Sequence, residues 1–374
     1  MLSNKNKVIY LDSAASALKP QSVIDAELDF LTNHYSNAGR GVCQRATYAD
    51  KMVADARAAA AEFINAKPEQ IVFTSGATDG LNRIPKILEV SGLLSSDSQV
   101  LVSDLDHHSA RLPWEDLSRR GKCKLSLAPL DKNFNIDSSK VYEADIFIIT
   151  SMSNVMGAQQ DVEKLAVAAR AKNPKVIIAV DASQSVVHEK VDVKKWDCDF
   201  LCFSAHKIGA DTGLGVMYIK EPDHWQADKL GGGMVQSANG HEFVLMQGND
   251  KFEAGTLPLT QLAGLKLAIS KQQTAIGNNN VINYLRSELE KIEKIKMISP
   301  KDAAIVTFTV DGMHALDFGA MLGAHGICLR VGNMCSSWMH SSLGLSHSIR
   351  LSPGPWNTME EIDEAVKIIK KIIN

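Results

Sequence analysis

Lys207 and Asp181 are the two residues whose types and spacing point most directly to chemistry. Lys207 stands in F-S-A-H-K-I-G-A-D-T-G, between a short apolar run and a glycine-rich turn, and Asp181 closes the earlier apolar run K-V-I-I-A-V-D. A lysine amine can hold an aldehyde cofactor as a Schiff base, and an aspartate beside a pyridine nitrogen keeps that nitrogen protonated. The pair therefore predicts a site for pyridoxal 5'-phosphate (PLP). Either residue alone is equally typical of a solvated lysine or of an aspartate that caps a helix.

A phosphate-binding turn is predicted in T-S-G-A-T-D-G, residues 74–80. Small residues allow backbone N–H groups to approach an anion, and the start of the following helix adds a favourable dipole. Ser204 and His206, just before Lys207, could complete this phosphate site. A glycine in a purely structural strand-to-helix turn and a surface histidine are the competing interpretations.

Two histidines and two arginines are candidates for contacts with the cofactor and the substrate. His107 could stack on the cofactor ring, because an imidazole offers a flat face and relays protons near neutral pH. His108 is the alternative, and adjacent loop histidines are also typical of solvated side chains. Arg330 or Arg350 could clamp the carboxylate of an amino-acid substrate, since arginine binds carboxylates through two hydrogen bonds. Without the PLP prediction, both would be interpreted as ordinary surface arginines.

The six cysteines are scattered, with no C-x-x-C pair, so they predict neither a zinc site nor a disulfide framework. Free thiols in a reducing compartment are expected. Cys198, Cys202 and Cys328 lie in apolar surroundings and are predicted to be small buried hydrophobic residues. Cys335 follows L-R-V-G-N-M and precedes S-S-W, a polar context that suits an exposed loop and a reactive thiol.

The elements that must position these residues alternate between helices and strands. Four apolar runs predict short strands, and the segments between them have helical spacing, including a helix that follows S-G-A-T-D-G and runs through Leu88. Nearly continuous apolar strands separated by helices indicate a buried parallel sheet, with the motif residues at the strand ends where such sheets bind ligands. The strands are expected at 70–74, 100–104, 145–150 and 176–181, and the clearest helical spacings at 23–63 and 162–172.

The character of the chain changes after F-E-A-G-T at 252–256, where a long helical region begins and continues to Lys294 with a break at G-N-N-N. Strands at 304–310, 327–331 and 348–352, a helix at 314–322 and a final helix are expected beyond it. Thr358 and Glu361 have the spacing of a capping box for that last helix. A chain of 374 residues exceeds one hydrophobic core, so two domains are predicted, 1–255 and 256–374. Residues 1 to about 15 could pack with the smaller domain.

The balance of charges is unremarkable, with 40 basic and 43 acidic residues and a net charge of −3. This mixture of charges does not indicate a basic surface that would bind nucleic acid or an anionic membrane. The N-terminus lacks an apolar core of signal-peptide length, and no run approaches the roughly 20 apolar residues of a membrane span. A cytoplasmic location is therefore expected, with neither nucleic acid nor membrane as a partner.

Taken together, these segments resemble the class V aminotransferase family, and most closely its cysteine desulfurases of the SufS/CsdA type. The resemblance covers nearly the whole chain. It implies the α/β fold type I of PLP-dependent transferases (aspartate aminotransferase-like), with a mainly parallel central sheet and a smaller C-terminal α/β domain. The motifs that carry it are Y-L-D-S-A-A-S-A-L-K-P at 10–20, D-H-H-S-A-R-L-P-W at 106–114, the stretch 180–207, F-E-A-G-T, and R-V-G-N-M-C.

The resemblance also implies roles for individual residues. Lys207 would be the Schiff-base lysine, Asp181 would contact the pyridine nitrogen, and Cys335 would be the sulfur-accepting nucleophile. No metal is expected. The remaining implied contacts are Gln184 and Asn154 in the polar shell of the ring, His107 stacked over it, Ala77, Thr78, Ser204 and His206 at the phosphate, Thr256 at the phosphate of the other subunit of a homodimer, and Arg350, with Arg330 nearby, at the substrate carboxylate.

The implied reaction converts L-cysteine to L-alanine and leaves a persulfide on Cys335. A SufE-like sulfur acceptor or a cluster scaffold protein would collect that sulfur for iron–sulfur cluster assembly or related sulfur transfer. This chain departs from the family pattern at the nucleophile, where Asn333 and Met334 replace two histidines, and also at Ala77 and Cys43. A selenocysteine lyase or a transaminase-like enzyme, in which Cys335 is incidental, stays open, as does a catalytically silent subunit that binds partners.

Overall fold

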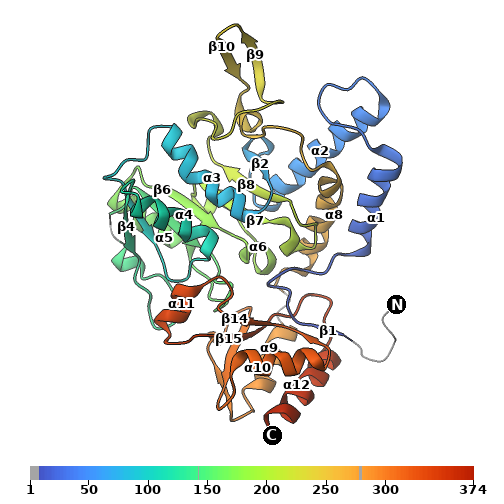
Figure 1. Ribbon diagram of the computed structural model, residues 1–374, viewed down its shortest axis with the longest axis vertical. Helices are drawn as coiled ribbons and strands as arrows, with labels where there is room; N and C mark the ends of the chain where they lie inside the picture. Colours follow the sequence, from blue (N-terminus) through green and yellow to red (C-terminus); the bar gives the residue numbers. More distant parts are fainter. Residues whose placement is uncertain (1–7, 142, 278–279) are drawn as a thin grey trace.

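The chain forms two main sheets with helices around them (Figure 1), and the computed structural model describes residues 8–141, 143–277 and 280–374. The larger sheet has seven strands. Only β8 runs antiparallel to its neighbours, so the predicted, mainly parallel sheet is confirmed. In spatial order the strands are β2 (Ile71–Thr74), β8 (Gly215–Ile219), β7 (Phe200–Ser204), β6 (Ile177–Asp181), β5 (Ile146–Thr150), β3 (Gln99–Val102) and β4 (Lys124–Leu127).

Both faces of this sheet are covered. Successive side chains of a strand point to opposite faces, so a strand buried on both sides must be apolar throughout. In β5, Phe147 and Ile149 join the apolar cluster that includes α2 (Gln44–Phe63), whereas Ile146 and Ile148 join the cluster that includes α3 (Ala77–Val90). This arrangement explains the continuous run I-F-I-I-T.

Helices, short turns and one hairpin surround the two sheets. The α-helices are α1 (Gln21–Asp29), α4 (His108–Arg119), α5 (Val162–Lys172), α6 (Ser185–His188), α7 (Val193–Trp196), α8 (Leu259–Ala275), α9 (Asn280–Leu289), α10 (Ala315–Ala324), α11 (Ser337–Ser342) and α12 (Met359–Ile373). The short 3-10 or π turns are η1 (Phe30–His34), η2 (Pro68–Gln70), η3 (Ser138–Lys140), η4 (Ala205–Ile208), η5 (Pro222–His224) and η6 (Gly248–Phe252). A hairpin of β9 (Val235–Asn239) and β10 (Glu242–Leu245) projects at the opposite end of the molecule from α12 (Figure 1).

The smaller sheet is antiparallel and lies in the C-terminal part of the chain. Its core cluster includes residues of α9, α10 and α12. The N-terminal strand β1 (Ile9–Tyr10) pairs in parallel with β13 (Ile327–Cys328) beside it. Residues 1–7 lie outside the described part of the chain. The order of the four strands is β11 (Ile295–Met297), β12 (Val306–Val310), β15 (Ser348–Leu351) and β14 (Arg330–Gly332).

The division into two domains near residue 255 stays a prediction. α8, which follows that point, packs against α1 and α2, and its buried residues Leu262 and Leu265 belong to a core cluster of the large sheet. After α8, the first described residue that packs against the core of the smaller sheet is Val281. We therefore propose that the smaller domain begins after α8 and also takes in β1.

Several predicted elements differ in detail. The helical spacing at 23–63 is interrupted, because α1 ends at Asp29 and residues 35–43, with two glycines, form a loop before α2. The strand expected at 327–331 is two strands, since β13 pairs with β1 and β14 pairs with β15. The strand β4 and the hairpin β9–β10 were not predicted. Part of the break expected at G-N-N-N, residues 278–279, lies outside the described residues.

The capping box of the last helix is confirmed. The backbone N–H of Glu361 donates to Thr358 Oγ1 at 3.3 Å, and the side chain of Glu361 accepts from the backbone N–H of Thr358. The helix therefore begins at the residue that the T-x-x-E spacing indicates. Across the described residues, none of the helices is both long and apolar enough to cross a membrane.

Candidate active site

A cavity of about 570 Å³ opens at the carboxyl ends of β5, β6 and β7, between the large sheet and the β14–β15 part of the smaller sheet. It brings together every predicted site residue except Thr256, which is exposed and does not line it. The predicted residues that line it are Ala77, Thr78, His107, Asn154, Asp181, Gln184, Ser204, His206, Lys207, Arg330, Cys335 and Arg350.

Asp181 ends β6 and is buried, with 5% of its surface exposed. Its Oδ1 accepts two hydrogen bonds from Ser183, one from the backbone N–H at 3.0 Å and one from the hydroxyl at 2.6 Å. These bonds fix the direction of the carboxyl group. Asp181 thus presents an oriented carboxyl group at the edge of the cavity, as a partner for a ring nitrogen must.

Lys207 lies in the turn η4, directly after β7, and points into the same cavity. Its Nζ donates to the carbonyl of Ala14, and Gln184 Nε2 donates to the same carbonyl oxygen at 2.8 Å. Burial, together with the neighbouring Arg350, lowers the pKa of Lys207 from 10.5 to about 8. Near physiological pH, the neutral fraction of such an amine is a minority but is far larger than that of an exposed lysine, and only the neutral amine attacks an aldehyde.

This lowered pKa predicts how the cofactor-free protein takes up PLP at different pH values. Below the pKa of about 8 the neutral fraction of Lys207 rises with pH, and above it the fraction is nearly constant. The rate of covalent uptake should therefore rise about tenfold per pH unit below 8 and level off above it. Stopped-flow absorbance of cofactor-free protein mixed with PLP measures this rate. A midpoint near 10, as for an exposed lysine, would contradict it.

The turn that is predicted to bind phosphate lies between β2 and α3. Gly76 has φ +150°, and a Cβ on Gly215 would lie 2.5 Å from Gly76 Cα, so the two backbones meet at a distance that only glycine permits. The N–H of Ala77 donates to Ser204 Oγ at 2.8 Å, which joins this turn to the end of β7. Ser204 thus takes the N–H of Ala77, and the first-turn N–H groups left without a partner within α3, those of Thr78 and Asp79, are available for an anion.

His206 and two amide side chains bear on whether a cofactor fits. Burial lowers the pKa of His206 to about 4, so its ring is neutral, and Nδ1 lies 3.3 Å from Ser16 Oγ. Within the described chain, Gln184 Oε1 and Asn154 Oδ1 are buried, line the cavity or its wall, and have no hydrogen-bond partner. Unpaired buried polar atoms are rare in folded proteins and call for a partner. A polar, phosphorylated pyridine such as PLP fits these groups, the glycine turn and Lys207 together.

Arg350 and Arg330 share one carboxylate. Arg350 is 2% exposed and donates to Asn154 O at 2.8 Å and to Asp12 Oδ1 at 3.0 Å, while Arg330 donates to Asp12 Oδ2 at 2.7 Å. Two guanidinium groups against one carboxylate leave a net positive charge at the cavity. A substrate carboxylate would therefore be attracted to this side, which agrees with the predicted roles of both arginines.

The thiol of Cys335 is exposed and lies in a loop with unusual backbone geometry. Met334 and Cys335 have φ of +51° and +57°. Side-chain-bearing residues pay roughly 1–2 kcal/mol each for such left-handed conformations. Neighbouring hydrogen bonds hold the loop, because Asn154 Nδ2 donates to Met334 O at 2.7 Å and the N–H of His108 donates to Cys335 O at 2.8 Å. The loop is thus tied to the segment that follows β5 and to the first residue of α4.

The other cysteines mostly match their predictions. Cys198 and Cys202 are fully buried, and burial raises the pKa of both thiols. Cys328 is only half-buried, because it lies in the short strand β13, so the prediction that it is buried is only partly right. Cys43 is exposed like Cys335, but it does not line the cavity.

His107 caps α4 beside the cavity. Its Nδ1 accepts from the N–H of Ser109 at 3.2 Å and lies 2.6 Å from Ser109 Oγ. Burial is the main cause that lowers the pKa of His107, and nearby Lys207 adds to it, whereas Asp181 opposes it. A neutral ring fixed by Ser109 at the cavity wall can lie against a flat ligand.

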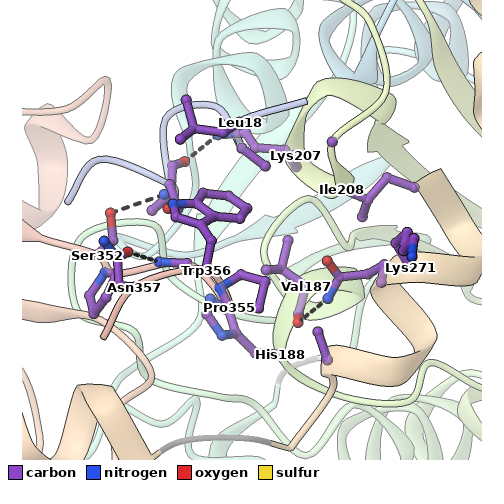
Figure 2. Close-up of a pocket in the computed structure, with 18 of the residues that line it drawn as sticks. Leu18, Val187, His188, Lys207, Ile208, Lys271, Ser352, Pro355, Trp356 and Asn357 are labelled. Atoms are coloured by element: carbon purple, nitrogen blue, oxygen red, sulfur yellow. Dashed lines mark hydrogen bonds between the residues drawn. The ribbon is translucent and has the colours of Figure 1, made fainter. Parts of the chain in front are cut away.

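A second cavity of about 730 Å³ adjoins the first and shares Lys207 and Ala14 with it. Figure 2 shows Lys207 at its edge, together with Trp356 and Ile208. Its walls come largely from the segment before α1, from α8 and from the loop that precedes α12. The candidate site described above lies entirely in the first cavity, and the two cavities meet at Lys207.

Sequence reasoning missed the residues that hold the predicted ones in place. Asp12, the carbonyl of Ala14 and Ser183 each bond directly to a predicted site residue. The first two lie within Y-L-D-S-A-A-S, the motif that opens the family resemblance, and Ser183 lies two residues after Asp181. A signal for them was therefore present, although it gave no indication of their partners.

Comparison with known proteins agrees with this geometry. The family model "Aminotransferase class-V" matches residues 9–365. A cysteine desulfurase of Serratia proteamaculans is 30% identical to this chain, over 99% of the chain and 94% of that protein. Among solved structures, the apo cysteine desulfurase of Thermococcus onnurineus NA1 is similar with a TM-score of 0.93 and 29% identity, covering 98% of this chain and 94% of that one.

A second similar structure is the cysteine desulfurase CsdA (S-sulfonic acid) of Escherichia coli, with a TM-score of 0.89 and 27% identity over 97% of this chain and 94% of that one. These matches agree with the α/β, fold-type-I architecture implied by the sequence. The predicted lysine, aspartate and arginines lie in one cavity. The family model matches nearly the whole length of the chain. The chain belongs to the class V aminotransferase family.

Proposed function

We propose that the protein is a PLP-dependent cysteine desulfurase, which converts L-cysteine to L-alanine and leaves a persulfide on Cys335. The observation that carries this proposal is that Lys207, Arg350 and Cys335 line one cavity, although they come from distant parts of the chain. A base, a carboxylate clamp and a thiol are the groups that sulfur removal from an amino acid requires. The similarity to cysteine desulfurases over nearly the whole chain supports the same activity.

The residues of the cavity have different roles in this reaction. PLP, when bound, supplies an electron sink that makes the Cα–H bond of the substrate acidic. Arg350 and Arg330 hold the substrate carboxylate, and Asp181 and Asn154 would orient the cofactor ring. Lys207 accepts the Cα proton, for which its pKa of about 8 is well matched to neutral solution.

Sulfur transfer itself falls to Cys335. Its sulfur attacks the substrate sulfur, so an S–S bond forms while the substrate C–S bond breaks. The released carbon fragment takes up protons and becomes alanine. Overall, the Cys335 thiol and L-cysteine give a Cys335 persulfide and alanine. This reaction balances without an external oxidant or reductant. The outer sulfur is then available to a second thiol.

The test adds L-cysteine to purified protein carrying PLP, and measures alanine by amino-acid analysis and added sulfur by mass spectrometry. Alanine together with one extra sulfur on the peptide that contains Cys335 is the expected result. Alanine without any protein-bound sulfur would favour a lyase. Absence of any amino-acid product from cysteine would reject the proposal in favour of another class V reaction or a silent partner-binding subunit.

The acceptor of the sulfur is proposed to be a protein thiol, on a SufE-like carrier or a cluster scaffold. Cys335 is exposed on its loop, which suits direct transfer to a second protein. Six free cysteines persist best in a reducing compartment, for which the cytoplasm is the proposed location.

We also propose a homodimer in which Thr256 reaches the phosphate of the other subunit. Exposed apolar side chains cover α1 and the segment before α2, among them Leu28, Leu31 and Tyr35, as a subunit interface would require. Thr256 is exposed and outside its own cavity, which leaves it free for a neighbouring one.

The dimer predicts complementation between two defective variants. Mixing Lys207→Ala and Thr256→Ala protomers produces heterodimers with one site that holds both wild-type residues. Desulfurase activity should therefore exceed that of either variant alone, by up to about half of wild type per heterodimer because one of the two sites is intact. A fully active protein that sediments as a monomer would contradict this prediction.

A further inference from the structure

The nucleophile loop, defined here as residues 333–338, is held in place chiefly by α4. Met334 and Cys335 both adopt left-handed backbone conformations, which persist only where the surroundings impose them. Figure 1 shows α11 beside α4 and away from the other C-terminal helices. The contacts between the loop and α4 therefore determine where the Cys335 thiol points.

His108, the first residue of α4, makes the contacts at this junction. Its backbone N–H donates to Cys335 O at 2.8 Å. Its ring Nε2 accepts from the N–H of Ser337 at 3.2 Å and lies 3.0 Å from Ser337 Oγ. Ser337 is the first residue of α11, whose own N-cap residue, Ser336, makes no side-chain capping bond. His108 thus supplies from another element the cap that α11 lacks.

The protonation of the ring is consistent with this role. Burial lowers the pKa of His108, which keeps the ring neutral and Nε2 free to accept. Ser337 Oγ accepts from Asn333 Nδ2 at 3.1 Å, so its own hydrogen can be donated to His108. Asn333 Oδ1 in turn accepts from the N–H of Cys335 at 3.2 Å. One chain of hydrogen bonds therefore runs from His108 through Ser337 and Asn333 to Cys335.

An edge-to-face aromatic contact reinforces the junction. The ring of Trp338 meets the His108 ring edge-on, with centroids 5.3 Å apart, and the guanidinium of Arg111 lies 4.1 Å from the Trp338 ring. Arg111 is itself held by Asp104, which precedes α4, and by Glu115. His108 and Arg111, one turn apart on α4, thus both contact Trp338.

We propose that His108 is a positioning residue for sulfur transfer, which fixes the nucleophile loop by capping α11 and so aims Cys335 into the cavity. This inference rests on the proposed function and refines it. Neither Asn333 nor Met334, the two residues before Cys335, has an imidazole ring. The imidazole of His108 holds the loop from α4 instead. His107 faces the cavity, and its neighbour His108 faces the loop, so one dipeptide serves both parts of the site.

The test compares three substitutions in the PLP-loaded protein. In His108→Ala the cap is lost, whereas in His108→Gln the amide oxygen can reach the position of Nε2, and in His108→Asn the side chain is too short. Hydrogen–deuterium exchange of a peptide covering 333–342 should speed up roughly tenfold in His108→Ala and His108→Asn, and stay near wild type in His108→Gln. The backbone bond from residue 108 to Cys335 O is the same in all three.

The kinetic readout separates positioning from binding. For alanine and persulfide formation, kcat should fall about 10- to 100-fold in His108→Ala with KM for L-cysteine changed less than about twofold, and His108→Gln should recover most of kcat. PLP content should not change. His325→Ala is the matched control, because His325 is an exposed histidine at the end of α10 whose ring Nδ1 lies 2.8 Å from Met321 O, away from the nucleophile loop.

The outcomes are distinguishable. Unchanged exchange of 333–342 in both His108→Ala and His108→Asn overturns the inference, and so does a Gln variant as slow as the Ala variant. A rise in KM with unchanged kcat overturns it as well. If the wild-type protein forms no persulfide, the proposed function fails, but the exchange experiment still decides whether His108 holds the loop. Should His108→Ala not fold, His108→Asn carries the same expectation.

Discussion

Replacement of Lys207 by alanine will abolish conversion of cysteine to alanine and leave PLP bound only through non-covalent contacts. Loss of a proton-transfer residue costs about 10²–10⁴-fold in rate, and loss of the attachment point adds to it, so activity should fall at least about 10³-fold. The reason is geometric, since Lys207 lines the same cavity as Asp181 and Arg350, and its Nζ shares the carbonyl of Ala14 with Gln184. The visible absorbance of the purified protein should change accordingly.

Chemical trapping provides the measurement. Borohydride reduction of the wild-type protein should fix the cofactor on the peptide that contains Lys207, and the Lys207→Ala variant should retain no covalent label. Lys271→Ala is the matched control, because Lys271 is an exposed lysine that lines the second cavity and not the first. A label on any other lysine would show that the attachment site has been assigned to the wrong residue.

Replacement of Cys335 by serine should have the second largest effect. A hydroxyl is a far weaker nucleophile toward sulfur than a thiol, so persulfide formation should disappear and alanine production should fall about 10²–10⁴-fold. PLP content should stay at the wild-type level, because Cys335 bonds only within its own loop and to the N–H of His108. Mass spectrometry after addition of cysteine, combined with an alanine assay, checks both expectations.

Cys43→Ser is the control for this experiment. Cys43 is exposed to solvent like Cys335, but it lies before α2 and outside the cavity, so its replacement should leave the activity unchanged. Full alanine production by Cys335→Ser would contradict the assignment, and extra sulfur mapped to another cysteine would do the same. Either result would favour a lyase or a transaminase-like reaction, in which this thiol takes no part.

The sequence indicates the site best where chemistry and local structure coincide. Asp181 and Lys207 each follow a continuous apolar run, and such runs become the central strands β6 and β7 because both faces of the large sheet are buried. Adjacent parallel strands end at the same edge, so the register that pairs Asp181 with Cys202 also brings Lys207 near Asp181. For these residues, local patterns suffice.

Contacts between distant segments could not be predicted in this way. Asp12 meets Arg350 across 338 residues, and nothing in the composition around Asp12 identifies its partner. The left-handed backbone of Met334 and Cys335 is equally hidden, because neither residue type favours it, and the surroundings that impose it lie on α4. The split of 327–331 into β13 and β14 depends on β1, which pairs from the other end of the chain.

The path of the N-terminal segment has a consequence for the order in which the enzyme can be completed during synthesis. Residues 9–12 provide β1 and the carboxylate of Asp12, yet their partners β13, Arg330 and Arg350 leave the ribosome more than 300 residues later. Translation proceeds at roughly 5–20 residues per second, so this first segment waits tens of seconds for its partners. A nascent chain can assemble the large sheet before these bonds exist, but Arg330 and Arg350, the proposed carboxylate clamp, join Asp12 only after residue 350 has been made. We therefore expect the growing chain to acquire its cofactor site before its ability to select a substrate.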